Sequence, residues 1–195
     1  MAAIAVPNFL EAQTRAKVSR AKADIRSLAT ALESYAVDNN KYPLDITDTS
    51  GMNRTPAGYF WYISNRITTP ISYITDNQLI DPFRDRRSTL PPVYWRFRYV
   101  NYSDADYYAA NPAILPGGGT GDYTSQSYYL GAPYHGAWRL SSAGPDAVAG
   151  ANGNFAPPPL VFVGPLIAYD PTNGTVSWGD IVRCQKDSDM KAATY

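Results

Sequence analysis

The sequence is poor in the residues from which most catalytic and metal sites are built. Its 195 residues include one cysteine, Cys184, and one histidine, His135. A single cysteine excludes a disulfide within the chain, and one cysteine with one distant histidine argues against a zinc site. No Gly-x-Ser-x-Gly motif is present, so a serine-hydrolase triad has no anchor. These absences predict a protein that is not an enzyme.

Charge is also scarce, and its two signs are balanced. The chain has 17 basic and 17 acidic residues, and only 17% of its residues are charged. Without a basic excess, nucleic acid is not expected as a partner. No run approaches the ~20 apolar residues that span a bilayer, which predicts that this chain is soluble as it stands. Tyrosine and proline number 16 each, a composition expected of an extracytoplasmic protein rich in strands and loops.

The first forty residues differ from the rest of the chain. Both glutamates, Glu11 and Glu33, lie there, whereas every later acidic residue is an aspartate. Glutamate tolerates a helix interior, while aspartate favours caps and turns. Apolar residues also recur here every three or four positions, a spacing that places them on one side of an α-helix: Val18, Ala21, Ile25, Leu28, Leu32 and Tyr35. We predict a helix over Ala2–Asn39 whose apolar stripe packs on the rest of the chain.

The other faces of this helix are predicted to be polar. Arg15, Lys22, Arg26 and Glu33 fall opposite the stripe, and the basic row of Arg15, Lys17, Arg20, Lys22 and Arg26 is interrupted only by Asp24. Such a row is either a surface that awaits neighbours or a solvated face. Pro7 is expected to kink or loosen the start of the helix. An asparagine at residues 39–40 can take the left-handed conformation that ends it.

The later sequence predicts a small sheet with long loops. Thr68 before a Thr-Pro pair is typical of a helix start and predicts a short helix to about Leu79. Residues 94–102 predict a strand with Trp95, Phe97 and Tyr99 on one face. A second strand region is expected at 137–146. Residues 168–183 predict a hairpin that turns at 173–174 and is followed by a half-buried Cys184.

Residues 3–24, Ala-Ile-Ala-Val-Pro-Asn-Phe-Leu-Glu-Ala-Gln-Thr-Arg-Ala-Lys-Val-Ser-Arg-Ala-Lys-Ala-Asp, closely resemble the N-terminal helix of type IV pilin-like proteins. Among these, the resemblance is to the major pseudopilins of type II secretion systems. Further along, Tyr42-Pro43 after Lys41 matches the family, and Asp81-Pro82-Phe83 resembles the Asp-Pro-Trp turn that precedes its sheet. The resemblance implies an α+β pilin-like fold, in which a long N-terminal α-helix packs on a small antiparallel β-sheet with long loops. It divides the chain into a helix stem, residues 1–40, and a globular head, residues 41–195.

The resemblance also implies a structural role as a subunit of a pilus or pseudopilus filament. The filament-packing residues would be those of the apolar N-terminal end: Ile4, Val6, Pro7, Phe9 and Leu10. The implied partners are further copies of the chain, other pilins, the inner-membrane assembly platform and the prepilin peptidase that acts on the full-length precursor. The implied location is the inner membrane for the precursor, and then a periplasmic or extracellular filament.

The leader and the processing site of the family are absent here, as is its buried glutamate. We interpret the chain as N-terminally truncated, either deliberately or through a start codon assigned too late. Without the missing apolar run, it is expected to stay monomeric or weakly associated.

A calcium ion near the C-terminus is a further implication of the resemblance. Residues 138–146 and 177–181 resemble two parts of the loop that holds calcium in pseudopilins. Asp146, Asp170 and Asp180 are the expected ligands, because calcium takes six to eight hard oxygens and such turns supply them together with backbone carbonyls. The alternative is that these aspartates only cap turns.

One function of another class stays open on the sequence. The chain could be a cell-surface carbohydrate-binding or adhesive module that stacks sugars on exposed aromatic residues. The residues for that role would be Tyr59, Trp61, Trp95 and Tyr107. Specific binding of the head to a glycan array would favour this alternative.

Overall fold

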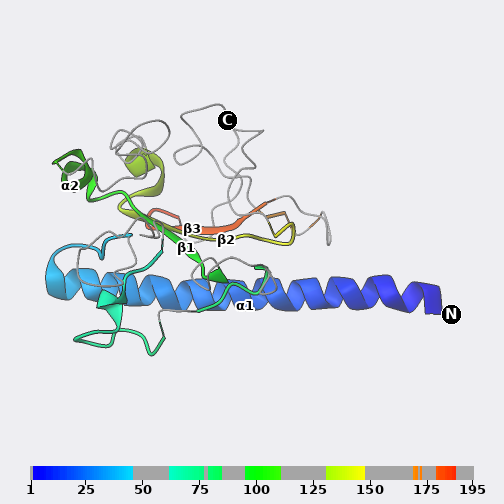
Figure 1. Cartoon of the computed structure of the whole chain (residues 1–195). Helices are drawn as coiled ribbons and strands as arrows, with labels where there is room; N and C mark the ends of the chain where they lie inside the picture. The colour runs from blue at the N-terminus through cyan, green and yellow to red at the C-terminus, as the bar shows by residue number, and fades with distance from the viewer. Residues whose placement is uncertain are drawn as a thin grey trace.

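The fold consists of one long helix and a three-stranded antiparallel sheet that lies along it (Figure 1). The computed structural model describes residues 2–45, 62–76, 79–84, 95–110, 131–147, 169–170, 172 and 179–187. Within them, helix α1 (Ala2–Asn39) is followed by the short 3-10 helix η1 (Asn65–Ile67) and by α2 (Ala105–Ala110). The predicted α+β pilin-like fold is confirmed.

Helix α1 has the predicted bounds. It runs through Pro7 without interruption. Asn40 has a φ of 55°, and asparagine tolerates this left-handed conformation better than most residues. The Asn39 side-chain amide donates to the carbonyl of Tyr35 at 2.9 Å. The helix therefore ends through its asparagines, as expected.

The sheet has the order β1-β2-β3, with β1 (Arg98–Asn101), β2 (Trp138–Ser142) and β3 (Ile181–Cys184). Both pairs are antiparallel, and Tyr99 lies opposite Leu140 while Arg139 lies opposite Cys184. Directly opposed residues share a face of the sheet. Tyr99 and Leu140 therefore point towards α1, and Arg139 and Cys184 point to the outer face.

The core lies between α1 and the inner face of the sheet. All six residues of the predicted apolar stripe are buried, with exposed fractions between 0 and 8%. They form one cluster with residues of all three strand segments, namely Phe97, Tyr99, Trp138, Leu140 and Ile181. Burying a large apolar side chain stabilises a fold by about 1.5–3 kcal/mol, so the stripe is what holds the head on the stem.

The prediction of a short helix after Thr68 is wrong. Within the described part of that range, residues 68–76 form turns and bends. The backbone N–H groups of Thr68 and Thr69 donate to the carbonyl of Asn65 and close η1 instead. Tyr73 then donates its hydroxyl to Asp38 at 2.9 Å. This contact with the end of α1 overrides the local preference for a helix.

The strands are shorter than predicted. Strand β1 begins at Arg98, while Arg96 forms only an isolated bridge with Ile80 and Trp95 lies in a helical turn. The turn predicted at 173–174 lies outside the described residues. Strand β3 belongs to the expected hairpin range, and the N–H of Tyr169 donates to the carbonyl of Asp180 at 2.9 Å.

Candidate assembly surface and calcium loop

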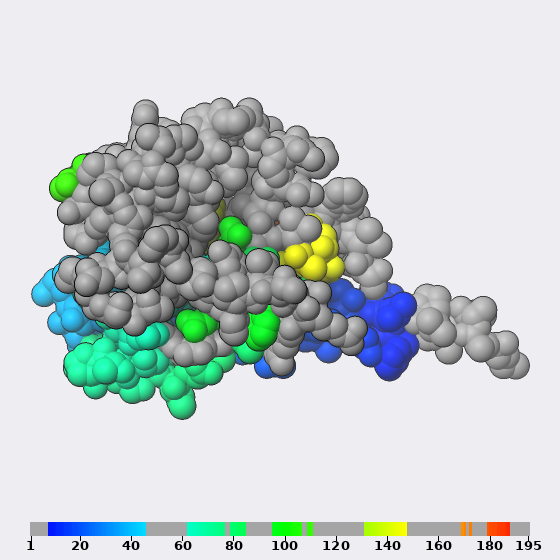
Figure 2. Space-filling model, viewed as in Figure 1, coloured from blue at the N-terminus to red at the C-terminus, as the bar shows by residue number. Residues whose placement is uncertain are grey.

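The start of α1 extends beyond the sheet in Figure 1, and its described residues, dark blue in Figure 2, lie at the surface of the molecule. Phe9 and Leu10 are 62% and 51% exposed. Val18 is the first buried residue of the stripe, and the ammonium of the neighbouring Lys17 lies 5.9 Å from the ring centre of Phe83. Of the other predicted filament-packing residues, Ile4, Val6 and Pro7 lie in α1, and their side chains are outside the described residues.

A second stripe, on the side of α1 opposite the core, was missed in the sequence. Its members recur every three or four residues, are small, and are all exposed: Ala12, Ala16, Ser19, Ala23, Ser27, Thr30 and Ser34. The hydroxyls of Ser27 and Thr30 donate back to helix carbonyls of Ala23 and Arg26, so they present little free polarity. The signal that would have found this small-residue face is its own helical spacing.

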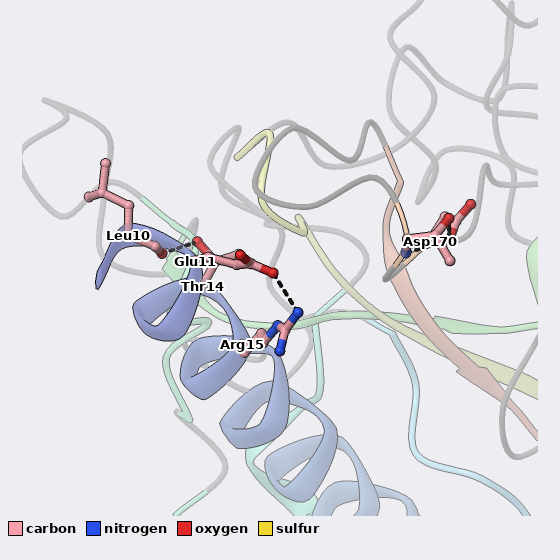
Figure 3. Close-up of polar contacts among 6 residues, drawn as sticks. Leu10, Glu11, Thr14, Arg15 and Asp170 are labelled. Carbon is pink, nitrogen blue, oxygen red and sulfur yellow. Dashed lines mark hydrogen bonds and ion pairs between the residues drawn. The ribbon is translucent and has the colours of Figure 1, made fainter. Parts of the chain in front are cut away.

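The basic residues of this part of α1 are only partly paired. Arg15 pairs with Glu11 along the helix (Figure 3), and Arg20 lies 3.6 Å from Asp24. Burial raises the pKa of Asp24, and Arg20 opposes that shift. For Lys22 and Arg26 the described residues contain no ion pair. Because exposed pairs of this kind contribute less than about 1 kcal/mol, the row does little for the fold itself.

Glu33, which the sequence placed on the polar side of the helix, joins α1 to the head. Its carboxylate accepts hydrogen bonds at 2.8 Å from the indole of Trp138 and from the hydroxyl of Tyr42. The Gln185 amide donates to the Tyr42 hydroxyl at 2.8 Å and accepts from the N–H of Ala137 at 2.6 Å. Burial and the Glu33 carboxylate raise the pKa of Tyr42 to about 12. These hydrogen bonds form a closed cycle through Glu33, Tyr42, Gln185, Ala137 and Trp138, which we call the Glu33 ring. It joins the stem to β2 and to the end of β3.

Asp81 forms a second tie, between the Asp-Pro-Phe turn and the end of β2. It is 1% exposed, and its carboxylate accepts from the N–H of Phe83 at 3.0 Å. It also accepts from the hydroxyl of Ser142 at 2.8 Å and from the N–H of Ala143 at 2.7 Å. Burial raises the pKa of Asp81, and these three donors oppose the shift. A buried carboxylate with three donors is a fixed structural element.

The predicted calcium loop converges at one end of the sheet. Gly144 has a φ of 66°, and a Cβ built on it would lie 2.1 Å from the carbonyl oxygen of Gly179. The turn at 144–147 thus lies directly against the start of β3. The hydrogen bond from the N–H of Tyr169 to the carbonyl of Asp180 brings residues 169–170 to the start of β3 as well. The three segments that carry the predicted ligands therefore meet.

The side chains of these ligands are less convergent. Asp180 is buried, Asp146 is half-buried and Asp170 is exposed. Both the N–H and the hydroxyl of Thr172 donate to Asp170, at 2.8 and 2.7 Å, and they lower the pKa of Asp170 (Figure 3). Asp170 therefore caps a turn. Among the described residues, no three acidic, histidine or cysteine side chains form a metal-binding group, so a calcium ion would depend on backbone carbonyls as well, and it stays a prediction.

The aromatic residues of the adhesive alternative do not assemble in the part of the chain that the structure describes. Trp95 is half-buried. Tyr59 and Trp61 lie outside the described residues, as does the side chain of Tyr107. Nothing in the described residues favours the carbohydrate-binding alternative.

The arrangement of a long N-terminal helix on a small antiparallel sheet is the α+β pilin-like fold that the resemblance implied. Residues 8–90 match the family model described as type II secretion system (T2SS), protein G. The chain is also similar to the type II secretion system core protein G of Pseudomonas aeruginosa, with 36% identity over 58 residues. That alignment covers 30% of this chain and spans 41% of the relative's length. No solved structure gives a significant match.

The predicted resemblance to the major pseudopilins is therefore confirmed in the first part of the chain. The matched family is a structural one and not a class of enzymes. Across the described residues, α1 included, no helix combines the length and the apolar character needed to cross a membrane.

Proposed function

We propose that this chain is a structural subunit of a type II secretion pseudopilus, a periplasmic filament, and that its copies associate through α1. The family match over residues 8–90 supports the pseudopilus. The observation that carries assembly through the helix is the division of α1 into two faces. One face is buried by the head, and the opposite one is an exposed stripe of small side chains.

Small side chains favour close helix packing. Interaxial distances between packed helices are about 8–10 Å, and the side chains at the contact set the value. A neighbouring helix seated on the small-residue face would approach at the short end of that range. It would also cover Phe9, which lies three and seven residues before Ala12 and Ala16 on the same face and is now exposed. Other pilins, the inner-membrane platform and the prepilin peptidase remain proposed partners on the strength of the family alone.

Site-specific photo-crosslinking tests this arrangement. A photoreactive residue at Ala16 or Ala23, both on the small-residue face, is expected to give homodimer adducts in cells that produce the protein. Ala109, exposed on α2, provides the matched control. Equal yields from all three positions, or no adducts from Ala16 and Ala23, would contradict assembly through this face.

Calcium binding is a separate proposal, supported by the convergence of the Asp146 turn with Asp180. A ligand at a hundredfold excess over its Kd stabilises the folded state by about 2.7 kcal/mol. Calcium is therefore expected to raise the melting temperature over that in a chelator, and Asp180→Ala should abolish the difference. Asp106→Ala, an exposed change on α2, should retain it. Identical melts of the unmodified protein in calcium and in chelator would rule the ion out.

A further inference from the structure

The only histidine of the chain lies in a buried cluster on the outer face of the sheet. His135 is 2% exposed, and its ring stacks on Tyr102 with centroids 5.3 Å apart and planes 19° from parallel. Arg139, from the outer face of β2, is 6% exposed and lies 5.9 Å from the Tyr102 ring centre. A guanidinium nitrogen of Arg139 is 3.5 Å from Nε2 of His135. The cluster thus places an ionisable ring against a fixed cation away from water.

The geometry assigns the protonation state of His135. A guanidinium has only donors, so Nε2 must accept and the ring hydrogen must sit on Nδ1. Nδ1 is buried and makes no hydrogen bond. A second proton would fall on Nε2, remove the acceptor for Arg139 and place two cations 3.5 Å apart. Burial, reinforced by Arg139, lowers the pKa of His135 to about 3.

The backbone around His135 holds the end of β3. The carbonyl of His135 accepts from the N–H of Lys186 at 3.4 Å, and the Lys186 ammonium donates to the carbonyl of Pro133 at 2.6 Å. Next in sequence, Gly136 has a φ of 79° and lies so close to Gln185 that a Cβ would come within 2.7 Å of its side-chain oxygen. Residues 131–135 form a short helical turn that ends at Gly136, and these contacts join this 131–136 turn to residues 185–186.

We propose that His135 is an acid-sensitive latch, whose neutral ring keeps the 131–136 turn and the end of β3 closed and whose protonation releases them. Among the described residues, the titratable groups around it are Tyr102 after β1, Arg139 on β2, and Cys184, Lys186 and Asp187 at the end of β3, while Asp45 acts on Tyr102. The charge that acts on the His135 ring itself is Arg139, which opposes an imidazolium. The latch acts on the fold of the head and does not depend on the proposed filament.

The direction of the pH effect follows from this arrangement. The closed state favours the neutral ring, so the full closing free energy is present above the ordinary pKa of 6.5. It is lost progressively as the pH falls from there towards 3. Given these two pKa values, the open population is expected to rise about 30-fold between pH 7.5 and pH 5.

The single cysteine is a built-in probe for this opening. Cys184 is 2% exposed and lies opposite Arg139. Its labelling by 4,4′-dithiodipyridine, which reacts at acid pH, is measured in the whole chain and divided by the rate for the unfolded chain at the same pH. The control is His135→Gln, which keeps an oxygen acceptor for Arg139 but has no proton to gain in this range.

The proposal predicts about 30-fold greater loss of Cys184 protection in the unmodified protein than in His135→Gln between pH 7.5 and pH 5. The carboxylates titrate in both proteins, so only the difference reports on His135. Parallel profiles would overturn the latch. Should the variant fail to fold, an NMR titration of the single imidazole in the unmodified protein decides: a folded-state value well below 6.5 supports the latch, and one near 6.5 overturns it.

Discussion

Replacing Asp81 by alanine is expected to lower the free energy of unfolding by about 3 kcal/mol or more. The change removes three hydrogen bonds to a charged acceptor and leaves the N–H groups of Phe83 and Ala143 without their partner. Both donors are buried, so water cannot take over that role without opening the turn. Urea unfolding, followed by circular dichroism, measures the loss.

Two further variants of this tie make the test specific. Asp81→Asn keeps the oxygen that serves Phe83 and Ser142 but turns an amide N–H towards that of Ala143, so an intermediate loss is expected. Lys22→Ala, an exposed change on α1, should change stability by no more than about 0.5 kcal/mol. If Asp81→Ala were as stable as Lys22→Ala, the tie would contribute nothing.

Leu28→Ala is expected to cost about 2–5 kcal/mol, the usual range for truncating a buried leucine. Leu28 is 1% exposed, in the centre of the stripe that packs on the sheet. Val37, on the same helix but 78% exposed, provides the matched control. Val37→Ala should leave the unfolding curve within about 0.5 kcal/mol of the unmodified protein. Equal curves for the two variants would mean that the stripe does not face a core.

What the sequence could predict was the part of the fold that local pattern encodes. The apolar period from Val18 to Tyr35 predicted which side of the helix would be buried, because only one side of a helix can meet a sheet. The asparagines at the end of α1 predicted where the helix stops. The alternation around Phe97 and Tyr99 predicted which strand residues meet the stem.

Features that depend on partners far apart in the sequence could not be predicted from local sequence pattern. The sequence at Thr68 is typical of a helix start, yet the segment forms turns, and the hydroxyl of Tyr73 donates a hydrogen bond to Asp38 on α1. Glu33 belongs by its position to a polar face, but Tyr42 and Trp138 come to it from the head. Likewise, His135 has no sequence neighbour that would predict its burial against Tyr102 and Arg139.

The position of the Glu33 ring has a mechanical consequence for a filament that is joined through α1. An axial force on such a filament enters each subunit along its helix and must cross to the head. The contacts from Val18 to Tyr35 are spread along the helix axis, so this force loads them in parallel, in shear, and no single contact has to yield first. The ring adds a direct transverse link from Glu33 to the ends of β2 and β3. We therefore expect the head and the stem to move as one rigid body under such a force.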